Sequence, residues 1–327
     1  MRYTSSHFPY APLVLAFLMA TTVLSSGKVM GQEARIQILK GDSLLRLEKP
    51  QRALDHYDKA IELDPSANSF LARAKAWDMM DRMDRFLLDV EQALRKDSTS
   101  ANAHYQRARY ALRAEDPEKA IAHATKSYSY ATQPLLQAQS LIVRGMALAE
   151  LKRTAPAIED LEKGVAATSS DAEVLRVLAR LYDQVGRYED ALRVLEQLCV
   201  IEAWDVGHWS NRGYELTMLG RYDEALGMIE KALEIDKDEP VALSNRAYVY
   251  TLLERDAEAW TDVERSLRNY PANPFALRTR AILRIRKGER AKACEDLILA
   301  KALGGVPDVD SLVKENCDTS GSKEKKR

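Results

Sequence analysis

The segment from Asp205 to Pro240 limits what this chain can fold into. It reads DVGHWSNRGYELTMLGRYDEALGMIEKALEIDKDEP. Apolar and small residues recur at helical spacing on both sides of a short turn, Leu219 to Tyr222, which indicates two amphipathic helices in a hairpin. One helix hairpin cannot bury its apolar face alone, so we expect the neighbouring segments to repeat it.

The same hairpin pattern recurs at a step of 34 residues. Gly220 at the turn aligns backwards with Gly186 and Lys152, and forwards with Glu254 and Gly288. With one shortening and one lengthening of a few residues, the frame predicts eight units, at about 34–66, 67–100, 101–137, 138–171, 172–205, 206–239, 240–273 and 274–307. A repeat of this period predicts a stack of helix pairs.

Three columns of the internal alignment support this frame. The close-contact position of the first helix is small in all eight units: Gly41, Ala74, Ala108, Gly145, Ala179, Gly213, Ala247 and Ala281. The matching position of the second helix is small in seven of eight: Ala53, Phe86, Ala120, Ala157, Ala191, Ala225, Ala259 and Ala293. A nearby packing position is always apolar: Tyr57, Val90, Ala124, Leu161, Leu195, Ile229, Val263 and Leu297. Small residues let paired helices approach closely, and the apolar residues fill the space between them.

On these residues the chain resembles the tetratricopeptide repeat (TPR) family. In the sixth unit the positions of the TPR signature are occupied by Trp209, Gly213, Leu216, Gly220, Tyr222, Ala225, Ile229 and Ala232. The resemblance extends over residues 34–307. It implies an all-α fold, a right-handed α-solenoid of about eight TPR-like helix hairpins, with partners bound on its concave side.

The N-terminus has a different composition. An apolar run extends from Ala11 to Leu24, and the segment that ends at Gly31 has small residues at the positions that signal peptidase reads. This pattern predicts a secretory signal peptide, residues 1–31, and hence an exported protein, periplasmic or secreted. The alternative is an uncleaved anchor, although the run is short for a membrane span.

One column that is normally apolar in the TPR pattern is mostly Arg here. In four units an Asp follows the Arg 16 residues later: Arg73/Asp89, Arg144/Asp160, Arg246/Asp262 and Arg280/Asp296. The fifth unit loses both partners, as Leu178 and Val194, which fits a partly buried pair because an unpaired buried charge is costly. We predict an interhelical ion pair in each of the four units; the alternative is a set of Arg side chains that line a ligand groove. Arg212 faces Met228, so we expect it to be the most available Arg.

The C-terminal sequence is similar to the ACEDL…AKALG…C ending of many exported bacterial TPR proteins. The resemblance implies a disulfide between Cys294 and Cys317, with a capping helix at 308–317 that covers the last unit. Two free thiols are the alternative. Residues 318–327 form a short basic tail, which we expect to be disordered.

The sequence contains no recognisable catalytic constellation. Its five His residues show no metal-ligand spacing, and zinc-protease, phosphate-loop and serine-nucleophile motifs are absent. The formal net charge of −1 disfavours a bulk attraction to nucleic acid. We therefore expect no enzyme activity, no metal and no cofactor.

The first helices contain residues that TPR proteins place on the concave side. Mapped through the resemblance, they are Lys75, Tyr105, Gln106, Arg109, Arg113, Arg176, Arg180, Ser210, Asn211, Tyr214, Ser244, Asn245, Tyr248, Arg278 and Arg286. Asn211 and Asn245 stand one repeat apart, and an amide there can donate to and accept from a peptide backbone. The Arg residues suit carboxylates.

These residues predict a non-catalytic interaction scaffold of the bacterial envelope that binds an extended, partly acidic polypeptide in the groove. Simple solvation of these side chains is the other interpretation. The alternative function is a module for a cell-wall glycan or another non-protein ligand, which needs exposed aromatic platforms; Tyr214 and Tyr248 are the only adjacent pair. No nucleic acid and no stable membrane span after signal cleavage are expected.

Overall fold

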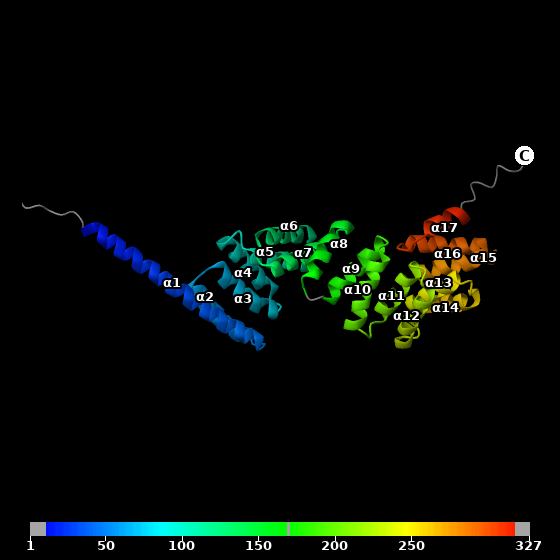
Figure 1. Ribbon diagram of the computed structural model, residues 1–327, viewed down its shortest axis with the longest axis horizontal. Helices are drawn as coiled ribbons and strands as arrows, with labels where there is room; N and C mark the ends of the chain where they lie inside the picture. The colour runs from blue at the N-terminus through cyan, green and yellow to red at the C-terminus, as the bar shows by residue number, and fades with distance from the viewer. Residues whose placement is uncertain (1–10, 169–170, 318–327) are drawn as a thin grey trace, which may run out of the picture. The chain divides into compact units, whose positions relative to one another are not determined.

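The computed structural model describes residues 11–168 and 171–317, and the regular secondary structure in both ranges is helical (Figure 1). The chain divides into two compact units, residues 1–169 and 170–327. The predicted all-α fold of helix hairpins is confirmed.

The first unit contains four helix hairpins. They pair α1 (Ala11–Arg46) with α2 (Pro50–Leu63), α3 (Ala67–Met79) with α4 (Met83–Lys96), α5 (Ala101–Arg113) with α6 (Pro117–Tyr130), and α7 (Pro134–Glu150) with α8 (Thr154–Ala166). Successive hairpins share a core. Tyr57 of α2 packs in one cluster with Ala72 and Ala76 of α3, for example.

The second unit contains four hairpins and a final short helix. They pair α9 (Ala172–Gln184) with α10 (Tyr188–Ile201), α11 (Val206–Met218) with α12 (Tyr222–Ile235), α13 (Pro240–Leu252) with α14 (Asp256–Asn269), and α15 (Pro274–Arg286) with α16 (Arg290–Leu303), and α17 (Val309–Asn316) follows. One cluster joins Leu192 of α10, Ile229 of α12 and Val249 of α13. Stacked hairpins therefore bury each other's apolar faces, as expected for a helical repeat.

Each hairpin turns at one residue in the left-handed backbone region. These residues, with φ between 53° and 79°, are Glu48, Asp81, Glu115, Lys152, Gly186, Gly220, Glu254 and Gly288. Glycine adopts this conformation without steric cost, whereas the five non-glycine residues bear some strain. The spacing of these eight left-handed residues along the chain agrees with the repeat predicted from the sequence.

Two boundaries differ from the predicted frame. The extra residues assigned to the end of the third unit belong to α7, which begins at Pro134, a position where a missing backbone N–H has no cost. Helix α1 runs without interruption from Ala11 past Gly31 into the first predicted unit. Residues 1–10 and 318–327 lie outside the described residues, so the disordered tail stays a prediction. Cleavage before Gln32 also stays a prediction, because the fold of the uncleaved chain does not test it. In the described part of the chain, no helix is long and apolar enough to cross a membrane.

Three glycines of the close-contact column allow an especially tight helix crossing. A Cβ atom on Gly213 would lie 2.3 Å from Ile229, on Gly41 2.5 Å from Tyr57, and on Gly145 2.7 Å from Leu161. No real contact is that short, so a Cβ at any of these positions would force the facing side chain to move. The small residue of each first helix thus makes room for the apolar packing residue of the second helix, as expected.

All four predicted Arg–Asp ion pairs are present, each with two hydrogen bonds from the guanidinium to the carboxylate. The shorter N···O distances are 2.7 Å for Arg73–Asp89, 2.6 Å for Arg144–Asp160, 2.6 Å for Arg246–Asp262 and 2.8 Å for Arg280–Asp296. This two-point geometry is the strong form of the interaction. Each pair ties the first helix of a hairpin to the second.

Arg212 is not available, which corrects the expectation. Its Nη2 donates to Glu196 Oε1 at 2.6 Å, and its Nε is buried without a hydrogen-bond partner among the described residues. Glu196 stands 16 residues before Arg212, on the second helix of the preceding hairpin. Arg107 pairs with Glu91 at the same spacing, 3.2 Å apart. These Arg–Glu pairs join successive hairpins, whereas the predicted Arg–Asp pairs lie within one hairpin.

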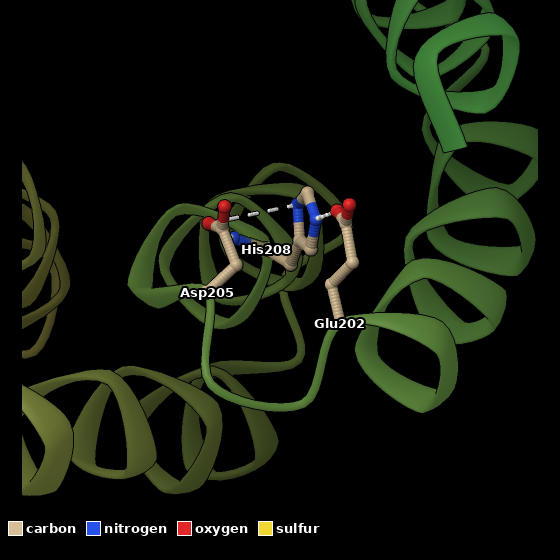
Figure 2. A group of neighbouring side chains, drawn as sticks. All are labelled: Glu202, Asp205 and His208. Carbon is tan, nitrogen blue, oxygen red and sulfur yellow. Dashed lines mark hydrogen bonds and ion pairs between the residues drawn. The ribbon is translucent and has the colours of Figure 1, made fainter.

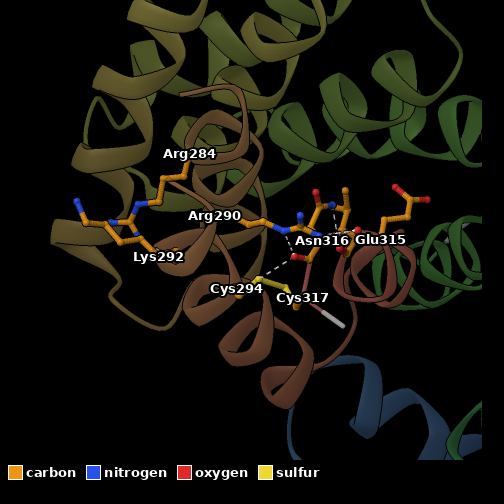
Figure 3. Close-up of a disulfide and its surroundings, with 8 residues drawn as sticks. Arg284, Arg290, Lys292, Cys294, Glu315, Asn316 and Cys317 are labelled. Atoms are coloured by element: carbon orange, nitrogen blue, oxygen red, sulfur yellow. Dashed lines mark hydrogen bonds between the residues drawn. A yellow bond between two sulfur atoms is a disulfide. The ribbon is translucent and has the colours of Figure 1, made fainter. Parts of the chain in front are cut away.

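Cys294 and Cys317 form a disulfide, with their Cα atoms 5.6 Å apart (Figure 3). It fixes the end of α17 against α16, and Leu312 and Val313 pack with Leu297 of the last hairpin. Arg290 donates to the carbonyls of Glu315 and Asn316, which gives partners to the C-terminal end of α17. Helix α17 therefore covers the last hairpin.

Candidate functional site

The second unit contains a pocket of about 460 Å³ lined by successive hairpins. Its walls come mainly from the first helices α9, α11 and α13, with contributions from α10 and α15. The lining residues are Arg176, Val177, Ala179, Arg180, Asp183, Leu195, Leu198, Asp205, Gly207, His208, Asn211, Tyr214, Glu215, Val241, Asn245 and Phe275. Apolar walls with a few convergent polar groups are the usual composition of a ligand site.

Five predicted groove residues meet in this pocket: Arg176, Arg180, Asn211, Tyr214 and Asn245. They come from three first helices because one helical face of each successive hairpin points to the same side. Arg180 and Asn211 are exposed, so both can reach a ligand. Arg176 is engaged with Glu202 at 2.6 Å.

Asn245 does not lie free for a ligand, contrary to the expectation of two equivalent amides. It is 6% exposed, and its Nδ2 donates to the carbonyl and the hydroxyl of Ser210 at 3.3 and 3.1 Å. Ser210 and Ser244 are also buried, which removes them from the set of groove residues. The difference is physical: Ser210 one hairpin earlier offers Asn245 two acceptors, and Asn211 has an exposed environment.

Two aromatic groups of the predicted groove contact neighbouring side chains. Tyr214 packs edge-on against Phe275 with ring centroids 6.2 Å apart. Arg278 lies over the ring of Tyr248 at 3.9 Å and is itself only 2% exposed, so it is not a surface cation as predicted. Tyr214 and Tyr248 therefore do not form a free aromatic platform.

In the first unit, the predicted groove cations are paired with acids of the same unit. Arg113 contacts Asp78 at 3.1 Å and Asp81 at 3.2 Å, and Arg109 contacts Asp78 at 3.4 Å. Lys75 contacts Asp42 at 3.2 Å. Tyr105 is partly buried, with the Arg109 guanidinium 5.9 Å from its ring centre. Arg286 of the second unit is likewise paired, with Asp256 at 2.5 Å.

Lys75 and Gln106 line a second pocket, of about 580 Å³. This pocket includes Gly31, at the predicted end of the signal peptide, so its shape depends on a segment that cleavage would remove. The pocket of the second unit does not have this dependence. We therefore take the second-unit pocket as the candidate site.

Glu215 is the most unusual residue of the pocket, and it was not among the predicted groove residues. It is 3% exposed, and its Oε2 has no hydrogen-bond partner within the described ranges. Burial, and then the nearby carboxylate of Asp183, raise the pKa of Glu215 to about 8. Burial also raises the pKa of Asp183. The pocket therefore contains two carboxylates whose charged forms are poorly stabilised.

The internal alignment contained a signal for Glu215. The other three hairpins of the second unit have Leu181, Val249 and Leu283 at the same position, each at most 1% exposed. An acid where the neighbouring repeats have buried aliphatic residues is the kind of local inconsistency that marks a functional or strained position.

Glu202, Asp205 and His208 cluster at the connection from α10 to α11 (Figure 2), although the His spacing predicted no such group. His208 Nε2 lies 2.7 Å from Glu202 Oε2, and Asp205 Oδ1 caps α11 by accepting the Gly207 N–H at 2.8 Å. Arg176 also donates to Glu202. The carboxylates thus already have local partners, and the geometry is that of a helix cap with a fixed imidazole.

Comparison with known proteins supports the repeat assignment. Residues 34–67, 174–203 and 212–243 match family models described as tetratricopeptide repeat. No curated protein matches the chain. The chain contains tetratricopeptide repeats, in both of its units.

Solved structures share the fold at low sequence identity. YrrB, described as a TPR protein with an unusual peptide-binding site, has 19% identity and a TM-score of 0.52, over 57% of this chain and 95% of that one. A tetratricopeptide repeat protein from Parabacteroides merdae has 17% identity and a TM-score of 0.51, over 76% and 97%. PilW, a type IV pilus biogenesis factor, has 18% identity and a TM-score of 0.52, over 62% and 93%. These similarities show the fold, a scaffold of TPR hairpins.

Proposed function

We propose that this chain is a non-catalytic interaction scaffold that binds an extended polypeptide in the second unit. The observation that supports it most is the pocket of about 460 Å³, where Arg180, Asn211 and Tyr214 converge from two first helices. An exposed amide beside an exposed guanidinium can bond a peptide backbone and its side chains. Tyr214 adds a rigid apolar surface.

Polypeptide is preferred over glycan as the ligand class because of the aromatic geometry. A glycan platform needs an open ring face, and Arg278 covers that of Tyr248 at 3.9 Å. The proposal does not require an acidic partner. Most of the groove Arg residues already have carboxylate partners, whereas Arg180 is exposed and has no ion pair among the described residues.

We also propose that the protein acts after export, in the periplasm or outside the cell. The N-terminal pattern predicts cleavage before Gln32, and a disulfide suits an oxidising compartment. Mass spectrometry of the exported protein should give Gln32 as the first residue and a Cys294–Cys317 linked peptide pair. An intact N-terminus on the exported protein would contradict cleavage and support an anchor.

The binding proposal can be tested with randomised peptides. Purified mature protein is mixed with a library of twelve-residue peptides displayed on phage, and retained sequences are measured against Asn211→Ala and Arg180→Ala variants. We expect either substitution to lower retention about tenfold, the effect of one good hydrogen bond. Gln197→Ala, an exposed amide on the second helix α10, is the matched control. Equal retention by Asn211→Ala, Arg180→Ala and Gln197→Ala would exclude this pocket.

A further inference from the structure

We propose that the pocket of the second unit selects a basic side chain, Lys or Arg, of the bound polypeptide, and that the Glu215 carboxylate meets its cation. The inference rests on the proposed function and names what this pocket recognises. Three independent features of the pocket lead to it: an acid without a donor among the described residues, a second acid beside it, and an apolar part of the pocket lining.

The first feature is the position of Glu215 in the core. The other three hairpins of the second unit have Leu181, Val249 and Leu283 at this position, so a leucine there would fit the fold and avoid the cost of burying a carboxyl group. Instead the side chain lines the pocket with Oε2 unpaired. A Lys ammonium brings three donors and an Arg guanidinium five, which is what this acceptor lacks.

The second feature is the charge around Glu215. Glu215 interacts with Asp183 of α9, Tyr188 of α10 and its neighbour Tyr214, and Tyr214 interacts in turn with Arg278 of α15. Tyr188 also interacts with Tyr248 of α13 and with Asp308, which precedes α17. Arg278 is stacked on Tyr248 and forms no ion pair with Glu215 among the described residues. The local charge at the carboxyl group is therefore negative and uncompensated when Glu215 ionises.

The other basic side chains of the pocket do not take the place of a ligand cation at Glu215. Arg176 and His208 both contact Glu202, 2.6 and 2.7 Å away. Arg180 is exposed. The pKa of Glu215, raised to about 8, indicates that these groups do not stabilise its charged form. A ligand cation would do so.

The third feature is the apolar part of the pocket. Val177, Leu195, Leu198 and Phe275 line it beside the acids. Lys and Arg side chains consist of an aliphatic stem with a charged end, so the stem can contact these walls while the end reaches the carboxylate. A carboxylate ligand would meet two acids, and a purely apolar one would leave Glu215 buried without a donor.

The test uses four pools of randomised twelve-residue peptides whose central residue is fixed as Lys, Arg, norleucine or Glu. The mature protein should be retained by the Lys and Arg pools about tenfold more than by the norleucine pool, which has a similar stem without the charge. Glu215→Gln, which keeps the size, should abolish this preference. Glu234→Gln, at an exposed carboxylate on α12, is the matched control and should keep it.

Acidity gives a second readout. Because protonation of Glu215 competes with the ligand, retention by the Arg pool should rise by about tenfold or more between about pH 6 and pH 9, and the rise should be absent in Glu215→Gln. Glu215→Leu, which restores the residue type of the column, provides a folded variant without the acid if Glu215→Gln is unstable.

The outcomes separate the two proposals. Equal retention of the Lys, Arg and norleucine pools would overturn the selection of a cation and leave polypeptide binding intact. Retention by no pool would overturn the proposed function and this inference with it. Preference for the Lys and Arg pools that survives Glu215→Leu would assign the cation to another acid and also overturn the inference.

Discussion

Buried carboxylates occur in two settings in this protein. Asp89, Asp160, Asp262 and Asp296 are 3–5% exposed, and each receives two hydrogen bonds from an Arg of the same hairpin. Glu215 is equally buried, at 3%, and its Oε2 receives none within the described residues. Burial alone therefore does not distinguish an acid with a structural role from an acid of a binding site. The difference is whether the protein itself supplies a hydrogen-bond donor. The four Asp residues have such a donor and hold their hairpins together, whereas Glu215 is left for a ligand.

The largest effect should come from breaking a satisfied pair. Arg246→Leu leaves Asp262 buried without its donor and should lower the free energy of unfolding by about 3 kcal/mol. The double variant Arg246→Leu/Asp262→Val copies the pair Leu178 and Val194 of the fifth unit and should recover most of that loss. Urea denaturation of the three proteins measures both effects. A double variant as unstable as the single one would show that the contact does more than satisfy a buried acid.

Removing the unsatisfied acid should have the opposite sign. The folded-state pKa of Glu215 is raised to about 8 from 4.5, so the stability associated with the protonated form is fully present below about pH 4.5 and is lost as the pH rises to about 8. Glu215→Leu should therefore stabilise the protein by roughly 2 kcal/mol at pH 9 and much less at pH 5. Urea midpoints at the two pH values test this, with the exposed Glu234→Leu as control. A gain that is the same at both pH values would assign it to packing alone.

The sequence predicted those parts of the molecule that repeat. The hairpin turns, the tight crossing at Gly213 and the pair Arg246–Asp262 all follow from one alignment, because each recurs with the same local chemistry. The candidate site was predicted in part. Asn211 and Asn245 look alike in their WSNRGY and LSNRAY contexts, and only three-dimensional packing buries one of them on a serine of the previous hairpin.

What the sequence missed depends on contacts between hairpins. The partner of Arg212 comes from the preceding second helix, and the covering of Tyr248 comes from Arg278 in the next first helix. The sequence shows Glu215 as an acid where the neighbouring repeats have aliphatic residues. That this acid lines a pocket is known only from the structure. Contacts within a hairpin are readable from spacing, whereas contacts between hairpins depend on how neighbours stack.

Two histidines of the first unit, His104 and His123, should lower the stability as the pH falls, by less than Glu215 lowers it as the pH rises. His104 Nε2 donates to the carbonyl of Ser98 at 3.0 Å, so its Nδ1 is the acceptor for the Nδ1–H of His123 at 2.9 Å. Burial lowers the pKa of both rings, that of His123 to about 4. The unfolded chain binds more protons below about pH 6.5, so stability is lost as the pH falls toward 4.

Replacing one ring should flatten this dependence. His123→Asn keeps a donor toward His104 but cannot titrate, so the loss of stability between about pH 7 and pH 4 should be roughly 1 kcal/mol smaller than in the wild type. Thermal melts across this range measure the difference, and the parallel titration of surface carboxylates cancels in the comparison. Identical pH profiles for the two proteins would mean that His123 has the same pKa in the folded and the unfolded chain, and would contradict the lowering of its pKa by burial.

The smallest effect on stability should come from Arg212, which occupies the same repeat position as Arg246 but has an exposed partner. Arg212 bonds Glu196, whose side chain is 58% exposed, and its own Nε is buried without an acceptor in the described part of the chain. Arg212→Leu returns Glu196 to water and removes an unpaired donor, so the free energy of unfolding should change by less than about 1 kcal/mol. The same substitution at Arg246, in the same column, leaves a carboxylate buried and should be the more damaging by at least about 2 kcal/mol. Equal losses of unfolding free energy at Arg212 and Arg246 would show that packing of the Arg stem, rather than burial of its partner, decides stability at this position. The distinction between acids with and without a donor would then no longer explain what stabilises the hairpins.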